Sequence, residues 1–229
     1  MFCFAKRGRF WYIIDCMAKI SIPKYTLGEE IFNSISHGIG AGLSIAALVL
    51  MVVKAKTGAA DVAVSLFGSM LIVLYTVSCV YHALSRNLKG KKVLRVIDHC
   101  NVYLLVFMTY IPVAWLAVGG ALGWVMFGVI GAVVATGVVF SAINVDKYQK
   151  LEVACHLISG WGSLIFLPIL LQGMGIGGVI FLILGGAMYS IGALLYMIGA
   201  KKKYMHCIFH LFCLAGSFFH FWCVYMYLL

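Results

Sequence analysis

The chain has 229 residues, of which 64% are hydrophobic and only 10% are Asp, Glu, Lys or Arg, whereas soluble domains carry about 25% charged residues. With a mean hydropathy of +1.05, apolar side chains must cover the outside as well as the core, which excludes an ordinary soluble domain and a disordered chain. The formal net charge of +10 does not indicate nucleic-acid binding, because the basic residues lie in short clusters between apolar runs. The composition predicts a helical membrane protein.

Residues 1–27 precede the first long apolar run. Their own apolar stretch, Trp11–Ile14, stops at Asp15 and is too short for a signal peptide. We therefore expect a cytoplasmic tail or an interfacial segment that lies on the membrane surface. Translation from Met17 is an alternative start that would leave a short polar entry to the first helix.

Seven apolar runs follow, and each is long enough to cross a hydrocarbon core of about 30 Å, which takes about 20 helical residues. In chain order they are 31–53, 62–85, 96–118, 121–143, 151–171, 175–199 and 205–228. Because the connectors are short, the runs predict a single all-α domain over residues 28–229, a seven-transmembrane-helix bundle. Pro112 and Pro168 are expected to kink their helices, and the glycines of 173–178 to form an outer turn.

Basic residues are distributed unevenly between the two ends of these predicted helices. All of the 17 Lys and Arg except Lys54 and Lys56 lie at the N-terminus or in the loops after the second, fourth and sixth runs. Basic loops stay on the cytoplasmic side. The N-terminus is therefore expected inside and the C-terminus outside, with the basic loops against anionic lipid headgroups.

Ionisable side chains within transmembrane segments are costly and indicate a functional site by default. Most of those in this chain fall near the cytoplasmic ends of the predicted helices. They are Glu30 and His37 on the first helix, His82 on the second, Asp98 and His99 on the third, His156 on the fifth, and His206 and His210 on the seventh. The polar but not ionisable Asn33 and Ser78 accompany them on the first and second helices. His220 lies further along the seventh helix.

His206 and His210 are four residues apart, which puts both imidazoles on one helix face where they can bind one tetrahedral metal ion. His82 lies at the same depth on another helix and can supply a third nitrogen. Three neutral imidazoles leave one coordination position open, the pattern of catalytic zinc sites. The alternative is that the histidine pair only meets headgroups or caps backbone carbonyls.

Asp98 is the candidate general base beside this site, and Glu30 is the next. Ser78 lies one turn from His82 on the same face, deeper in the membrane. We interpret His99, His156 and His220 as structural, and Cys79 and Cys207 as small buried hydrophobic residues.

Four motifs in this order resemble the bacterial hemolysin III family, which is related to the progestin and adipoQ receptors and more remotely to alkaline ceramidases. They are GEEIFNSISHG at 28–38, Ser78-x-x-x-His82, Ile97-Asp98-His99 and His206-x-x-x-His210. The resemblance covers roughly residues 17–229. It implies a multi-pass protein of the bacterial inner membrane with zinc near the cytoplasmic face, bound by His82, His206 and His210, with Ser78 and Asp98 beside it.

Three functions remain open on this basis. The first is zinc-dependent hydrolysis of a lipid amide or ester, with the acyl chain lying between helices. The second is a lipid-sensing or membrane-homeostasis role, receptor-like and non-catalytic, with structural zinc. The third is a cytolytic pore, which we rank last because the outer halves of the helices offer little polar lining.

Overall fold

The computed structural model describes residues 20–199 and 202–229, so that the Trp11–Ile14 stretch and the possible start at Met17 lie outside the described residues. The described part of the chain is helical and has no strand. The elements are α2 (Leu27–Lys54), α3 (Gly58–Ala83), α4 (Lys89–Pro112), the π-helix η1 (Val113–Val118), α5 (Gly120–Asn144), α6 (Gln149–Trp161), the 3-10 helix η2 (Gly162–Phe166), α7 (Leu167–Gly199) and α8 (Met205–Tyr227). The predicted all-α class is confirmed.

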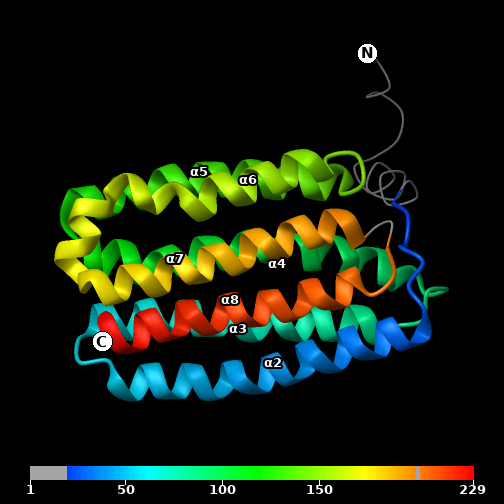
Figure 1. Cartoon of the computed structure of the whole chain (residues 1–229), viewed down its shortest axis with the longest axis horizontal. Helices are drawn as coiled ribbons and strands as arrows, with labels where there is room; N and C mark the ends of the chain where they lie inside the picture. Colours follow the sequence, from blue (N-terminus) through cyan, green and yellow to red (C-terminus); the bar gives the residue numbers. More distant parts are fainter. Residues whose placement is uncertain (1–19, 200–201) are drawn as a thin grey trace, which may run out of the picture.

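The helices lie side by side along the longest axis of the molecule, and consecutive helices run in opposite directions (Figure 1). One end holds the start of α2 together with the connections from α3 to α4, from α5 to α6 and from α7 to α8. The opposite end holds the connection from α2 to α3 and the C-terminus. The basic connectors of the sequence therefore gather at the first end, which we call the inner end.

Six helical stretches of the described residues are long and apolar enough to cross a membrane, which makes the chain a multi-pass membrane protein. The longest, Gln149–Gly199, has 51 residues, more than twice the length of about 20 that one crossing needs. Within it the backbone leaves the helical conformation at Gly175, with φ 66° and ψ 176°, inside the predicted glycine turn. Two crossings in this stretch, and hence seven in total, stay a prediction.

Helices α2 and α4 begin before their apolar runs because polar contacts extend them. The side chain of Thr26 caps α2 and Glu29 bonds back to the Thr26 backbone, a reciprocal capping box that starts the helix at Leu27. Helix α4 begins at Lys89, and its first turns carry Lys91 and Arg95, whose buried side chains bind carboxylates of other segments. Hydropathy alone places both starts too late.

The surface of the bundle carries large apolar side chains, which suits a lipid environment. Leu43 on α2, Val129 on α5 and Ile165 in η2 are 64%, 59% and 83% exposed. Two buried clusters form the core: one joins α4 to α5, α6 and α7, and the other joins α3 to α2, α4 and α8. A single soluble domain could not expose so much apolar surface without aggregating.

The orientation in the membrane is a testable prediction. A reporter that works only outside the cytoplasm should be active when fused after Leu229, because the basic inner end is retained inside. The matched control is the same reporter inserted after Asn87, in the basic connection between α3 and α4, where it should be silent. Strong activity of a cytoplasm-only reporter after Leu229 would reverse the topology.

Candidate metal centre

Three histidines meet near the inner end of the bundle. His82 comes from the last turn of α3, and His206 and His210 come from the first two turns of α8. Their side chains are 2%, 7% and 1% exposed, and one nitrogen of each lies within 4.8 Å of the others. The structure therefore brings together the three residues that the sequence singled out, and this group could hold a metal ion.

The separation of the nitrogens fits a shared ion. The Nε2 atoms of His206 and His210 are 3.2 Å apart, close to the roughly 3.3 Å expected for two nitrogens bound tetrahedrally at about 2.0–2.1 Å from zinc. Nε2 of His82 is buried without a hydrogen-bond partner. Since buried polar atoms are nearly always paired, an unpaired imidazole nitrogen beside two others indicates a place for a ligand.

A carboxylate orients the His82 ring so that Nε2 can bind a metal ion. Nδ1 of His82 donates to Oε2 of Glu30 at 2.6 Å, which leaves Nε2 as the free nitrogen. The other oxygen of Glu30 accepts from Nζ of Lys91 at 2.7 Å, and the same ammonium donates to the Leu84 carbonyl. A carboxylate behind a histidine is the usual support for a metal ligand, because it sets the tautomer and the ring direction.

Aromatic rings hold the other two histidines. Tyr25, which precedes α2, stacks on His206 with ring centroids 4.8 Å apart and an angle of 18°. His37 on α2 stacks on His210 at 3.7 Å and 16°. Burial raises the pKa of Tyr25 well above its ordinary value, so its ring covers the site as a neutral group. All three candidate ligands thus have a neighbour that limits their rotation.

The start of α8 is fixed by Glu29. Its Oε1 accepts from the backbone N of Tyr204 at 2.7 Å, where Tyr204 takes a left-handed φ of 64°. A non-glycine residue rarely adopts this conformation without support from its surroundings. The contact holds the turn that places His206 two residues later.

The segment before α2 is tied to the inner end by a second carboxylate. Asp146, between α5 and α6, accepts hydrogen bonds from the backbone N and the hydroxyl of Ser21 and pairs with Arg95 at 2.7 Å. Burial alone would raise the pKa of Asp146, but the Ser21 hydrogen bonds and the Arg95 charge outweigh it and hold the pKa below its usual value. The carboxylate therefore stays ionised and keeps Tyr25 over the histidines.

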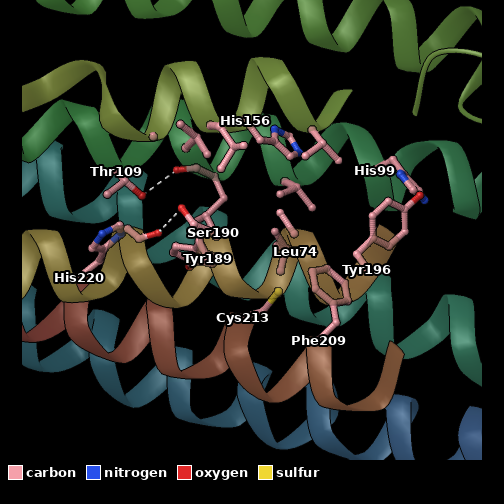
Figure 2. A pocket seen from close by; sticks show the side chains of 18 of the residues that line it. Leu74, His99, Thr109, His156, Tyr189, Ser190, Tyr196, Phe209, Cys213 and His220 are labelled. Carbon is pink, nitrogen blue, oxygen red and sulfur yellow. Dashed lines mark hydrogen bonds between the residues drawn. The ribbon is translucent and has the colours of Figure 1, made fainter. Parts of the chain in front are cut away.

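A large cavity begins at the metal centre and runs outward through the bundle (Figure 2). His206 and His210 line it together with Ser78 and Asp98. The structure thus places both predicted catalytic residues in the wall beside the histidines. Their roles stay predictions. Glu30, the second candidate base, has both oxygens engaged with His82 and Lys91.

The other histidines also lie in the cavity wall, at both of its ends. Figure 2 shows His99 beside Tyr196 near the inner end, and His220 beside Thr109 at the far end. Cys207 is buried as predicted, whereas Cys79 is partly buried. Sequence reasoning missed Glu152 and Tyr25. Glu152 carried one signal, an acidic residue inside an apolar run four positions before His156, and Tyr25 carried none.

Comparison with known proteins finds relatives over most of the chain. The family model described as "Haemolysin-III related" matches residues 25–221. "Hemolysin-3" of Bacillus cereus is 35% identical over 204 residues, 88% of this chain and 92% of that protein, and the "Hemolysin-3 homolog" of Bacillus subtilis is 35% identical over 206 residues, 89% and 96%. Human "Monocyte to macrophage differentiation factor" is 25% identical over 170 residues, 71% and 69%, a distant match that supports the expected relation to the progestin and adipoQ receptors. The chain therefore belongs to the haemolysin III family of integral membrane proteins.

Proposed function

We propose that this protein is a zinc-dependent hydrolase of a lipid amide or ester, acting in the bacterial plasma membrane with its histidine site toward the cytoplasm. The observation that carries the proposal is that a buried group of three histidines, able to hold a metal ion, lies at the end of a long apolar cavity that also contains a carboxylate and a hydroxyl. Neither feature alone would indicate lipid chemistry.

The shape of the cavity suits one hydrocarbon chain. It is lined from Asp98 on α4 to Val113 at the start of η1, and along α8 from His206 to His220. Each stretch spans about 22 Å at about 1.5 Å per residue. Its volume is about 130 Å³, whereas a single water occupies roughly 10–15 Å³ when volume is measured in the same way. An acyl chain with its polar end at the histidines would bury apolar surface along this length.

Lipid must reach this cavity from the side, and the seam between α6 and α7 is the candidate route. Gly160 on α6 lines it and is exposed on the outer surface of the bundle. Gly186 faces the same region from α7, beside a smaller pocket that also contains Trp161. The ring of Trp161 lies against Gly186 at this seam, so a chain that enters from the bilayer must displace this ring.

The residues around the histidines support hydrolysis. A zinc ion held there would act as a Lewis acid on the carbonyl and make water more acidic. The carboxylate of Asp98 takes the proton from the attacking water and returns it to the leaving group. We assign to Ser78, in the same cavity wall, the role of orienting Asp98, while the apolar walls hold the chain and limit the number of competing waters.

One observation favours the non-catalytic alternative. The three histidines are almost fully buried under Tyr25 and His37, and they join α3 to α8. A metal ion there would cross-link two helices even without chemistry, as in a lipid-sensing protein with structural zinc. The basic loops at the inner end would in either case contact anionic headgroups.

Zinc dependence of lipid turnover tests the proposal. Purified full-length protein should release fatty acid from a ceramide-like or acyl-lipid substrate, lose this activity with a chelator and regain it when zinc is restored. Boiled protein carried through the same steps is the control. If no lipid of the panel is turned over while zinc removal still lowers the melting temperature, the structural alternative replaces the enzyme.

A further inference from the structure

A second polar cluster lies in the wall of the same cavity, on α4 and α6. His99 on α4 donates from Nδ1 to Oε1 of Glu152 on α6 at 2.7 Å, and His156 lies one turn after Glu152. All three line the cavity. We call His99, Glu152 and His156 the α6 cluster, and Figure 2 shows His99 and His156 on the side of the cavity away from Phe209 and Cys213 of α8.

The α6 cluster contains unpaired polar atoms. Glu152 is only 5% exposed, yet its Oε2 has no hydrogen-bond partner, and Nδ1 of His156 has none either. Burying an unpaired polar atom costs several kcal/mol in an apolar medium, and burying an unpaired carboxylate oxygen costs more. Such an arrangement is stable only if something else in the cavity pairs with these atoms.

The cluster is held rigidly. The hydroxyl of Tyr103 on α4 donates to the backbone carbonyl of Glu152 at 3.0 Å, and the Tyr103 ring lies against that of His156 with centroids 3.8 Å apart. Tyr103 itself is fully buried. The backbone of Glu152 and the ring of His156 are therefore fixed where α4 packs against α6, and the His99 contact holds the carboxylate.

The α6 cluster and the metal centre bound one polar chamber at the inner end. The ring of Tyr196 on α7 lies between them, 5.6 Å from His99 and 6.1 Å from His206 by ring centroids. Asp98 is next to His99 and lines the same space. A lipid whose acyl carbonyl reaches the three histidines would thus place the rest of its headgroup beside Glu152.

A second metal ion does not account for the cluster. Among the described residues, the histidines of α3 and α8 are the group whose ligand atoms come close enough to share an ion, and the α6 cluster is not part of it. A purely structural ion pair accounts for only one of the carboxylate oxygens, since His99 is the ion-pair partner of Glu152 within the described part of the chain. Oε2 remains available to a ligand.

We infer that the α6 cluster is a headgroup-binding subsite for a hydrogen-bond donor of the lipid, an ammonium in preference to a hydroxyl. Oε2 of Glu152 accepts the donor, because a carboxylate pairs more strongly with a cationic donor than with a neutral one. His99 keeps the carboxylate in place. The subsite makes Glu152 a specificity-determining residue that binds the headgroup and takes no part in cleaving the acyl bond.

The inference rests on the proposed function in one respect, that the cavity takes a lipid, and its test needs no hydrolysis. Purified full-length protein loaded with zinc is titrated with uncleavable single-chain lipids of one chain length that end in a primary amine, an alcohol or a methyl ether, and binding is measured from the rise in melting temperature. The wild type should bind the amine most tightly and the ether least.

The substitution Glu152→Gln keeps the size of the side chain and an acceptor oxygen but removes the charge. It should weaken amine binding about 10–100-fold, the usual effect of losing a charged hydrogen-bond partner, and weaken alcohol binding far less. Asp61→Asn, the same change at an exposed site on α3, is the matched control and should leave all three affinities unchanged.

Zinc content and the melting temperature without ligand are measured for each variant, so that a damaged fold or metal centre is recognised. Wild-type amine affinity in a zinc-containing, folded Glu152→Gln protein would overturn the inference, as would equal binding of amine and ether by the wild type. Neither result depends on whether any lipid is hydrolysed, so the proposed function fails or holds separately.

Discussion

Purified wild-type protein should contain one zinc ion per chain, and His206→Ala or His210→Ala should lose it completely. The two Nε2 atoms are 3.2 Å apart and His82 supplies the third nitrogen, so removing either α8 histidine leaves two ligands in a site that needs at least three protein ligands. Elemental analysis of protein purified without added chelator measures the stoichiometry directly.

The control for this experiment is His220→Ala. His220 is on the same helix and lines the same cavity, but it lies about 15 Å from His210 along the helix at about 1.5 Å per residue, too far to share the ion. This variant should keep its zinc. Stoichiometric zinc in the His206→Ala, His210→Ala double variant would show that the ion is bound elsewhere and would remove the basis for the proposed chemistry.

The metal centre could be predicted because the position of a residue along a transmembrane helix gives its depth in the membrane. Residues near the ends of adjacent antiparallel helices must lie at one level, and a spacing of four puts two side chains on one face. These two rules selected His82, His206 and His210, which the structure brings within 4.8 Å of one another.

The partners of these residues could not be predicted in the same way. The contact between Glu30 and His82 requires that α2 packs against α3 and that α2 is rotated so that Glu30 faces His82. The spacing of residues along one helix gives no information on either point. Tyr25 lies outside every apolar run, so its stacking on His206 is decided by the path of the chain before α2. That path is set by the Ser21 and Asp146 hydrogen bonds, between segments far apart in sequence.

Glu152 is a second residue whose role hydropathy could not predict. A single carboxylate hardly lowers the mean hydropathy of a long apolar run, so hydropathy predicts a membrane span over 151–171 and no role for this residue. Its importance comes from facing His99 on α4 and from having one oxygen unpaired. Both are properties of the packed bundle, since the same residue on the lipid-facing side of α6 would have been a simple interfacial group.

Asp98→Asn should distinguish a catalytic metal site from a structural one. Asparagine keeps the shape and the hydrogen-bonding reach of Asp98 but cannot accept a proton, so hydrolysis of a confirmed lipid substrate should fall by roughly 10²–10⁴-fold, the usual contribution of a general base. Zinc should stay bound with an affinity lowered about 10–100-fold, as for other residues that support metal ligands. Initial rates with the zinc-loaded proteins provide the measurement.

The comparison must be made at saturating zinc, because a weaker metal site would otherwise mimic the loss of a base. Glu30→Gln is a useful companion, since Glu30 supports His82 but has both oxygens engaged. It should therefore weaken zinc binding and recover most of its activity when zinc is added in excess, whereas Asp98→Asn should not. If Asp98→Asn hydrolyses lipid at the wild-type rate with zinc in place, Asp98 is not the base and the proposed proton transfer is wrong.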